Sequence, residues 1–425
     1  MSTPTNAEIQ QAVAVRRDEI VQMLLDLIAI PSVTGNEGDA QNFVSTHLTA
    51  AGLEVHSFLS SAEEIADYVM HVGEQPTFEN RPSIVATRKG AGGGKSLMIG
   101  GHVDTVPVED RAKWNYPPEG EVVGDRIYGL GSTDMKGGVI TAMLVPVILS
   151  DLGVQLEGDL FVNTVTGEED GGLGTMSTIL QGYRPDGVVI TEPTRQRVGV
   201  ASGGSLVFRI TVTGKAAHGG QRNEGVSAIE KFIPIFQDLL AWEAERQATV
   251  HHPLYDGYAN KFPISVGTIR AGDWASTVPD KLTAEGRLGF LPGESMESMM
   301  AQTQAHIDAV AAQDEWLRDH PPVLEFFSGQ FVAEEIPVDH PLTLAVLDAH
   351  ETISGAATDA WALTAGTDAR LWIHFADVPA VLYGAGVLPL AHQSNEYNEI
   401  EPLLESIAVL TRLAIDWCGI AEAEA

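Results

Sequence analysis

Short continuous apolar runs alternate with helically spaced apolar positions over most of the first 200 residues. The runs are typical of buried strands, and apolar spacings of three and four residues are typical of helices. Strand patterns cover 83–88, 96–101, 159–165 and 187–191, and helical patterns cover 20–30, 139–152 and 172–182. Strands and helices that take turns in this way predict an α/β domain with a largely parallel central sheet.

The pattern changes near Ala201. The segment SLVFRITVTG alternates apolar and polar residues with a period of two, which predicts a half-exposed strand. Helical patterns follow at 225–248 and 297–310, and strand patterns lie at 261–272, 280–290 and 323–329. The rhythm of helices and buried strands resumes after Pro337. We therefore predict a discontinuous α/β catalytic domain, 1–202 and 331–425, that carries an inserted α+β domain at 203–330.

Composition narrows the class of partner. The chain of 425 residues has 58 acidic and 25 basic residues, a formal net charge of −33. This charge argues against nucleic acid and against anionic membrane surfaces as partners. The single cysteine, Cys418, lies in an apolar periodic stretch, so we expect a buried structural thiol. The first residues show no apolar signal core, and the run VITAMLVPVIL is too short to span a bilayer, so we expect a cytoplasmic protein.

Side chains that can bind metals or transfer protons follow the predicted strands of the α/β domain. They stand at five places: His102 after SLMIGG, Asp134 before the helix at 139–152, Glu168 and Glu169 after DLFVNTV, Glu192 after GVVIT, and His392 after PAVLYGAG. In an open α/β sheet, ligands gather outside the carboxyl ends of the strands, so these places should converge. Taken singly, a histidine there is more often a hydrogen-bonded core residue, and a carboxylate before a helix is more often an N-cap.

The set of residues predicts a metal centre. Four or more carboxylates in one crevice cannot all stay ionised without a multivalent cation, because like charges raise each other's pKa. Carboxylates with two imidazoles and no thiolate suit zinc, cobalt or manganese, and two ions fit better than one. Neighbouring side chains on an extended backbone point to opposite faces, so one of Glu168 and Glu169 can ligate while the other acts as general base. Asp104 points the same way as His102 and can hold its second ring nitrogen.

Five motifs carry a resemblance to a known family. HVDTVP, GLGSTDMKGG, TGEED, ITEPT and AHQSNEY resemble the dinuclear-zinc amidohydrolases that include acetylornithine deacetylase, succinyl-diaminopimelate desuccinylase, aminoacylases and glutamate carboxypeptidase. The resemblance covers nearly the whole chain, in order. It implies that His102 and Glu192 complete one metal site, that Glu169 and His392 complete the other, and that Asp134 bridges them. It also implies Asp104 as the residue that orients His102, and Glu168 as general base and later proton donor.

The resemblance extends to the inserted domain. The family uses this domain as a lid and usually for dimerisation, which implies a homodimer. TGKAAHGG is similar to the lid motif whose histidine, here His218, reaches the active site of the partner subunit and stabilises the tetrahedral oxyanion. From the residues alone, the alternative is that His218 caps a strand-to-helix turn.

Some positions depart from the family pattern or bear on the substrate. Ser276 stands where many relatives carry a substrate-contacting asparagine, and Leu130 stands where an arginine is common. Arg287 in AEGRLGF and Arg370 in GTDARLW are candidates for gripping a substrate carboxylate through two parallel hydrogen bonds. Ordinary ion pairs are the alternative for both arginines. Trp274 and Phe290 are expected to shape the pocket.

These features predict metal-dependent hydrolysis of the amide bond of a small N-acyl amino acid or related N-acyl amine. The alternatives within enzymes are a carboxypeptidase or dipeptidase and a deformylase acting on a pyrimidine-type N-formyl amine. A phosphoesterase is disfavoured because no basic cluster is placed to hold phosphate. A catalytically silent binding protein on a hydrolase fold is the alternative outside enzymes. The full set of ligands, with Glu168 and Asp104 present, argues against it.

Overall fold

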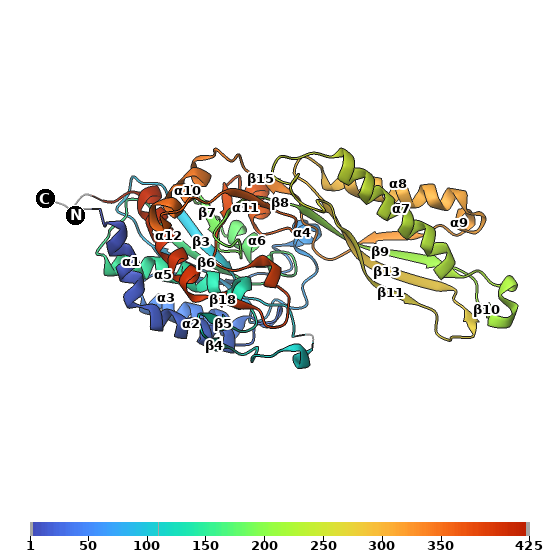
Figure 1. Cartoon of the computed structure of the whole chain (residues 1–425), viewed down its shortest axis with the longest axis horizontal. Helices are drawn as coiled ribbons and strands as arrows, with labels where there is room; N and C mark the ends of the chain where they lie inside the picture. Colours follow the sequence, from blue (N-terminus) through green and yellow to red (C-terminus); the bar gives the residue numbers. More distant parts are fainter. Residues whose placement is uncertain (1–2, 109, 422–425) are drawn as a thin grey trace. The chain divides into compact units, whose positions relative to one another are not determined.

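The computed structural model describes residues 3–108 and 110–421 of a chain that folds into two compact units. The large unit comprises Met1–Val200, Glu335–Trp361 and Thr367–Ala425, and the inserted unit comprises Ala201–Glu334 and Ala362–Gly366. Figure 1 labels the helices and strands of both units along the chain.

A mixed β-sheet forms the centre of the large unit. Its strand order is β1-β2-β6-β3-β7-β17-β8-β15, with β16 paired to β8. The strands are β1 (Glu54–Leu59), β2 (Pro82–Arg88), β3 (Leu97–His102), β6 (Leu160–Val165), β7 (Val188–Ile190), β8 (Val198–Ser202), β15 (Glu334–Glu335), β16 (Ala360–Leu363) and β17 (Ala380–Leu382). The central strands β6, β3, β7 and β17 run parallel. The predicted α/β class with a mostly parallel sheet is confirmed.

The flanks of this sheet run antiparallel, which the sequence pattern did not predict. Strand β2 is antiparallel to both β1 and β6, and β8 is antiparallel to β17. Residues 89–96 alone join β2 to β3. A crossover between parallel strands needs a dozen or more residues, so a link this short makes the chain re-enter the sheet in the opposite direction.

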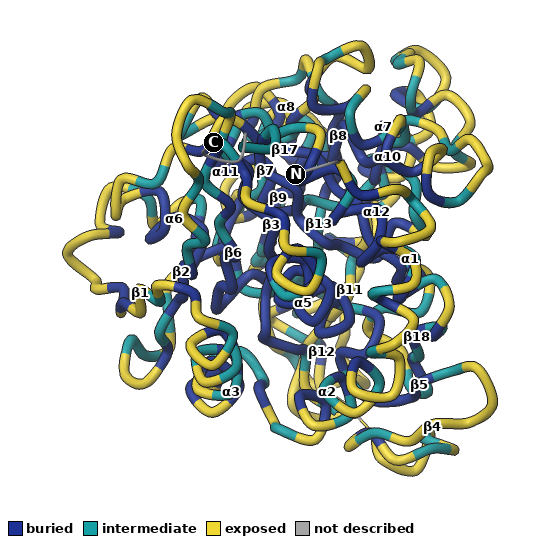
Figure 2. The backbone as a smooth tube through the Cα atoms, turned by 90° about the vertical axis from the view of Figure 1, so that its left-hand side faces the viewer, coloured by how far each residue is buried: buried dark blue, intermediate teal, exposed yellow. Residues whose placement is uncertain are grey.

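Helices cover the sheet of the large unit. They are α1 (Asn6–Val15), α2 (Arg17–Ala29), α3 (Gly38–Ala50), α4 (Val69–Val72), α5 (Gly137–Asp151), α6 (Leu173–Leu180), α10 (Pro341–Ser354), α11 (Ala369–Ala376) and α12 (Ile400–Cys418). Figure 2 shows the deeply buried central strands between α6 and α11 on one side and α5 and α12 on the other. Cys418, at the end of α12, is a buried free thiol.

Helix α5 is apolar around its whole circumference. The helical segment Ser132–Asp151 is long and apolar enough to cross a membrane, and 94% of its most apolar window is buried inside the protein. A helix that is hydrophobic on all sides is buried in the core of a large protein or spans a membrane. Here the sheet and α12 pack against α5 and cover it.

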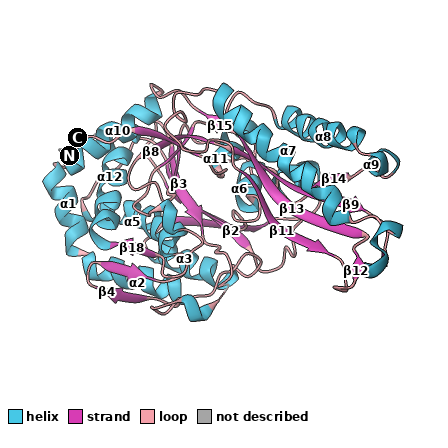
Figure 3. Ribbon diagram, turned by 45° about the vertical axis from the view of Figure 1, so that its right-hand side comes forward, coloured by secondary structure: helices cyan, strands magenta, loops and turns pink. Residues whose placement is uncertain are grey.

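The inserted unit is an antiparallel sheet covered by helices. Its strand order is β11-β13-β9-β14, from β9 (Gly204–Thr213), β11 (Ile264–Ala271), β13 (Lys281–Phe290) and β14 (Val323–Phe326). Figure 3 shows α7 (Ala228–Thr249) and α8 (Met296–Gln313) on one face, and α9 (Glu315–Asp319) follows α8. Alternate residues of β9, such as Phe208 and Ile210, are fully buried in the core of this unit. A small pair, β10 (Ala217–His218) and β12 (Thr277–Val278), completes it.

The inserted unit extends beyond the predicted segment 203–330. Residues 201–202, 331–334 and 362–366 also belong to it, although the prediction assigned all three segments to the catalytic domain. Backbone hydrogen bonds explain the difference, because Phe331 pairs with Ser205 and the N–H of Gly203 donates to the carbonyl of Leu363. Such long-range pairs have no signature in local hydrophobic periodicity.

Candidate metal centre

Three parallel strands deliver acidic and imidazole side chains to one edge of the large unit's sheet. His102 is the last residue of β3, Glu168 and Glu169 follow β6, and Glu192 follows β7. These strands are direct neighbours and run in the same direction, so their carboxyl ends lie together. The predicted convergence of these positions is therefore present in the fold.

Two further residues reach this edge from loops. Asp134 lies in the turn Ser132–Lys136 before α5, and the peptide bond that follows it is cis. His392 lies shortly before β18 (Tyr397–Glu399), which pairs with β5 (Arg126–Tyr128), itself paired with β4 (Glu121–Val123). The Nδ2 of Asn398 in β18 donates to the carbonyl of Ser132 over 3.0 Å, which ties the two loops together.

The Asp134 carboxylate lies between two imidazoles. Its Oδ1 is 3.3 Å from Nε2 of His102, and its Oδ2 is 3.6 Å from Nε2 of His392. The same Nε2 of His392 is 2.9 Å from Oε2 of Glu169. His102, Asp134 and Glu169 each offer one ligand atom within 4.8 Å of the others. This is the spacing of atoms that can share a metal ion.

The charges around this point perturb one another strongly. Burial and the nearby charge of Asp134 raise the pKa of Glu192 to about 8, and burial raises the pKa of Glu168 well above its usual range. Burial lowers the pKa of His102, but the carboxylates of Asp134 and Asp104 outweigh that effect and hold this pKa well above the ordinary value. The hydrogen bond to Glu169 raises the pKa of His392 to about 9. Bound protons thus neutralise the charges of these clustered carboxylates. A divalent cation would neutralise the same charges, so the residues fit a metal.

Asp104 contacts His102 through its backbone carbonyl and has further contacts through its carboxylate. The ring Nδ1 of His102 is hydrogen-bonded to the backbone carbonyl of Asp104 at 2.9 Å, whereas the Asp104 carboxylate lies 3.6 Å from Nδ1. The fully buried carboxylate instead accepts the backbone N–H groups of Glu168 and Glu169, each over 3.2 Å, and the hydroxyl of Thr34. Asp104 therefore both orients His102 through its carbonyl and fixes the backbone that carries the two glutamates.

Two predicted lid residues lie together in the inserted unit. His218 pairs with Thr277 across β10 and β12, and the N–H of Gly219 donates to the carbonyl of Ser276 over 2.6 Å. Both His218 and Ser276 are exposed. Nδ1 of His218 accepts the N–H of Gly220 over 3.2 Å, which is the capping role considered as its alternative. This bond leaves the proton of a neutral imidazole on Nε2, where it can be donated to a ligand.

The two arginines proposed for substrate carboxylate binding differ in environment. Arg287 on β13 is half-buried, and its Nε has no hydrogen-bond partner among the described residues. Burial lowers the pKa of Arg287. Arg370 is fully buried, and its guanidinium donates to the backbone carbonyls of His71, Gly171 and Thr367 and to the Asp368 carboxylate. The structural alternative fits Arg370, because no part of its side chain faces solvent.

Three other positions singled out in the sequence have distinct places. Trp274 is exposed, whereas Phe290 is buried in the core of the inserted unit, which differs from its expected place at the pocket. Leu130 lines a pocket of the large unit together with Val108, Trp114 and His392. Leu130, which stands where relatives commonly have an arginine, therefore gives this pocket an apolar side chain beside the proposed metal ligand His392.

Sequence reasoning missed some residues of the site. Asp368 and Thr175 line a pocket with His102, Glu168 and Glu192, and the Thr175 hydroxyl donates to Asp368 over 2.6 Å. Glu396 accepts the N–H of Thr133 beside Asp134, and burial raises its pKa to about 8. Glu396 stands in the quoted motif AHQSNEY and Asp368 stands in GTDARLW, so both were within reach of motif reading. Their burial and partners, however, are visible only in the fold.

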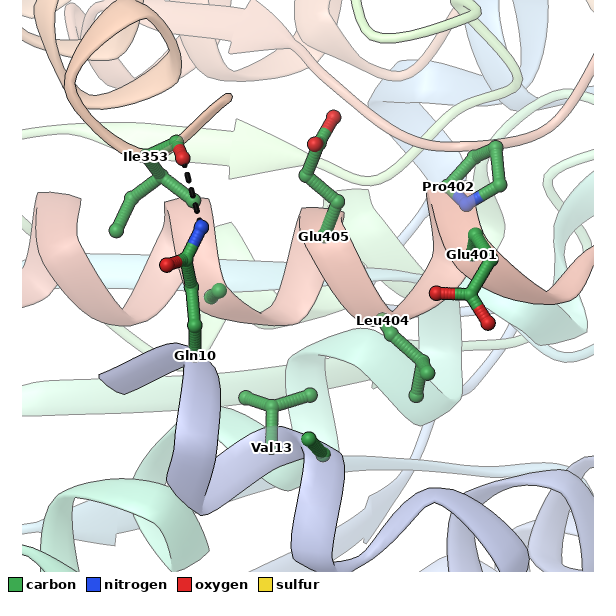
Figure 4. A pocket seen from close by; sticks show the side chains of 9 residues that line it. Gln10, Val13, Ile353, Glu401, Pro402, Leu404 and Glu405 are labelled. Atoms are coloured by element: carbon green, nitrogen blue, oxygen red, sulfur yellow. Dashed lines mark hydrogen bonds between the residues drawn. The ribbon is translucent and has the colours of Figure 1, made fainter. Parts of the chain in front are cut away.

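A separate pocket lies between α1, α10 and α12 (Figure 4). The side chain of Gln10 donates to the carbonyl of Ile353 over 2.8 Å, and Leu404 and Val13 form apolar lining beside Glu401. None of the predicted site residues lines this pocket, so it is not a part of the metal centre.

Comparison with known proteins identifies the family. A family model described as peptidase family M20/M25/M40 matches residues 98–416, which is more than half of the chain. The chain belongs to this family. The resemblance seen in the motifs is confirmed, and so is the prediction of a metal-dependent hydrolase that acts on amide C–N bonds.

Relatives of this chain have several named activities. It is 27% identical to the N-formyl-4-amino-5-aminomethyl-2-methylpyrimidine deformylase of Halalkalibacterium halodurans, over 96% of each chain. It is 23% identical to a probable succinyl-diaminopimelate desuccinylase of Staphylococcus aureus, over 94% of this chain and 97% of the relative.

Solved structures share the fold. Human carnosine dipeptidase 1 aligns with a TM-score of 0.76 at 16% identity, over 98% of this chain and 100% of that one. The YXEP protein of Bacillus subtilis, described as a dinuclear metal binding peptidase, aligns with a TM-score of 0.63 at 14% identity, over 95% of this chain and 99% of that one.

Proposed function

We propose that this protein removes the acyl group from a small N-acyl amino acid or related N-acyl amine, with two divalent metal ions at the strand ends. The observation that carries the proposal is the Asp134 carboxylate between the imidazoles of His102 and His392. Asp134 would be shared by both ions, with His102 and Glu192 on one and Glu169 and His392 on the other. Zinc is the metal that we propose, and cobalt or manganese suits the same donors.

The bound ions would lower the pKa of a water molecule and polarise the substrate carbonyl. Glu168 is the general base that we propose, since its Oε2 is 3.9 Å from Nε2 of His102, close to the centre but without a short contact to that imidazole. It takes a proton from the attacking water and then delivers that proton to the departing amine nitrogen. His218, with its proton on Nε2, donates to the oxyanion from the partner subunit of a homodimer.

Arg287 supports an N-acyl amino acid as substrate. A half-buried guanidinium without an ion-pair partner among the described residues is suited to a ligand carboxylate, which it can bind through two hydrogen bonds. We propose that Ser276, whose carbonyl accepts the N–H of Gly219 next to His218, contacts the acyl group. We propose that this reaction takes place in the cytoplasm.

A second candidate is deformylation of an N-formyl amine that carries a pyrimidine-type ring. Two observations favour it. The 27% identity to the Halalkalibacterium deformylase covers 96% of both chains. The pocket beside His392 has an apolar part formed by Val108, Trp114 and Leu130, and Lys113, Gln393 and Ser394 are among its polar lining residues. An aromatic side chain with aliphatic neighbours binds a planar substrate ring better than it binds a substrate carboxylate.

The test is amine release from N-acetyl and N-succinyl amino acids, an N-formyl aminomethylpyrimidine and dipeptides, each with zinc, cobalt or manganese. We expect one class to be cleaved, and we expect Glu168→Gln to lower kcat by about 10²–10⁴-fold, the range for a lost general base. Metal content should not change. The exposed carboxylate of Glu63 gives the matched control, Glu63→Gln, which should retain wild-type kcat. Normal turnover by Glu168→Gln with its metals bound would contradict the mechanism.

A further inference from the structure

The loop that carries Glu168, residues 166–172, is held mainly by polar contacts. Its glycines 167, 171 and 172 have φ values of 69°, 126° and 84°, which only glycine adopts readily. Within the loop, the N–H of Gly172 donates to the carbonyl of Gly167 over 2.7 Å and that of Gly171 donates to the carbonyl of Glu168 over 2.9 Å. A segment so rich in glycine has many accessible conformations, so its neighbours must select one of them.

On one side, the loop is fixed through Asp104. The two backbone N–H bonds from Glu168 and Glu169 to this carboxylate define where the glutamates leave the main chain. These bonds orient the amide groups of the loop but leave the carbonyls that follow to other partners.

On the other side, the loop is fixed through Arg370. Its NH2 group donates to the carbonyl of Gly171 over 2.8 Å and to that of His71 over 3.2 Å, while NH1 donates to the carbonyl of Thr367 over 3.0 Å. One guanidinium therefore connects the Glu168 loop, the residues of α4 and the start of α11. A planar group with five donors can serve three carbonyls at once, which an ammonium group on a flexible stem does poorly.

Asp368 keeps this guanidinium in place. Its Oδ1 lies 3.3 Å from NH1 of Arg370, and its Oδ2 accepts the Thr175 hydroxyl over 2.6 Å. A side chain at Gly172 would bring its Cβ to within 2.2 Å of Oδ1, so the carboxylate packs directly on the loop backbone. Thr175 lies in α6, immediately after the loop, so two residues that Asp368 contacts, Gly172 and Thr175, belong to the first turn of that helix.

We propose that Arg370, held by Asp368, is a positioning residue that sets the Glu168 loop for proton transfer. This inference rests on the proposed role of Glu168 as general base. A buried ion pair is weak evidence for stability, because desolvation offsets its attraction and an apolar pair of similar volume often serves as well. The arrangement instead orders a loop whose carboxylate must lie within reach of the attacking water. A displacement of about 1 Å at such a group can cost about 10²-fold in rate.

The experiment compares Arg370→Lys and Arg370→Met with Thr175→Val. We expect Arg370→Met to lower kcat by about 10²-fold, with KM within about threefold of wild type and metal content unchanged. Arg370→Lys should recover part of this loss because it retains the charge next to Asp368. Thr175→Val removes one hydrogen bond to Asp368 at constant volume and should lower kcat by about three- to tenfold. Should Arg370→Met fail to fold, the other two variants decide the question.

The matched control is Arg246→Lys. Arg246 is also a buried arginine that donates to a backbone carbonyl, that of Gly289, and to a carboxylate, that of Glu294, but it lies in the inserted unit. The Arg246→Lys variant should have lower thermal stability than the wild type and a kcat within about twofold of the wild-type value.

Two results would overturn the inference. A raised KM at constant kcat in Arg370→Lys would indicate that Arg370 binds the substrate. Wild-type kcat in both Arg370→Lys and Thr175→Val would indicate that Arg370 is purely structural. Either result together with an inactive Glu168→Gln rejects this inference alone. An active Glu168→Gln rejects the proposed function itself.

Discussion

At the scale of single residues, environment separates two arginines that the sequence could not tell apart. Arg287 and Arg370 are both arginines within short motifs, and both could bind a carboxylate or form an internal ion pair. In the structure, Arg370 has an internal carboxylate and carbonyl groups as partners, whereas Nε of Arg287 has none among the residues described. A largely desolvated cation without an anion is the feature that indicates a ligand.

Arg287→Met distinguishes the two proposed reactions. For an N-acyl amino acid, loss of charge-assisted hydrogen bonds worth about 1.5–3 kcal/mol should raise KM by about 10–100-fold at little change in kcat. For a neutral N-formyl amine the KM should be unaffected. Steady-state kinetics with both substrate types checks this. Arg270→Met, on the exposed part of neighbouring β11, is the control and should alter neither KM. Equal effects on both substrate types would indicate that Arg287 is only structural.

At the scale of elements, the first turn of α5 packs closely against the strand end that precedes a proposed metal ligand. Gly138 lies so close to the end of β7 that an added Cβ would be 2.1 Å from the carbonyl oxygen of Thr191, the residue before Glu192. Gly137 approaches Asn398 in the same way, with an added Cβ at 2.2 Å from its Nδ2. The turn that carries Asp134 thus lies directly against the strand end that carries Glu192, because the helix begins with two residues that have no side chain.

Gly138→Ala should separate these two elements. Alanine favours a helix interior by about 1 kcal/mol over glycine, but overlap with a backbone oxygen forces a shift that costs about 1–3 kcal/mol, so we expect net destabilisation. The melting temperature should fall, and the apparent metal affinity should weaken by about tenfold. Calorimetry and metal titration check these expectations. Gly257→Ala is the control, since an added Cβ there meets nothing within 4 Å. An unchanged metal affinity in Gly138→Ala would show that this packing does not set the ligand spacing.

At the scale of the whole molecule, protons and metal ions compete for the same acidic centre. The chain has a net charge of −33, and several of its carboxylates are gathered and buried at one edge of the sheet. Without metal, burial and like charge hold a proton on Glu192, and the contact with Glu169 holds one on His392. Both effects have the same sign, because each makes the folded protein bind more protons than the unfolded chain.

Stability of the metal-free protein should therefore fall as pH rises. The pKa of Glu192 rises from 4.5 to about 8 on folding, and that of His392 rises from 6.5 to about 9. Between the unfolded and the folded pKa of each group, the folded state binds more protons than the unfolded chain. The stabilisation that this proton binding gives is therefore present at low pH and is lost as pH increases to about 9. Melting temperatures of the chelator-treated protein should show this decline, and added metal should reduce it.

The matched variant for this pH dependence is Glu192→Gln. In the metal-free state, its decline of melting temperature with pH should be smaller than that of the wild type, since one of the titrating groups is absent. A metal-free wild type whose melting temperature rises between about pH 5 and pH 9 would contradict the assignment of the raised pKa values.

The sequence by itself predicted the central strands, the helices beside them and the side chains that gather at the strand ends. Continuous apolar runs mark β3, β6 and β7 because their side chains are buried on both faces, and the ligands follow these strands because parallel strands end at one edge. The motifs also indicated the family. These features are local in the chain, so hydrophobic periodicity and residue order record them.

Only the tertiary structure decided which partners the polar groups take. The carboxylate of Asp104 bonds to the Glu168 loop, whereas its carbonyl bonds to His102, and Arg370 donates to a backbone carbonyl of that loop. The antiparallel direction of β2 and the addition of 362–366 to the inserted unit were likewise decided by long-range pairing. The physical reason is the same in each case: a hydrogen bond depends on distance and direction between residues far apart in sequence, and no local pattern specifies these.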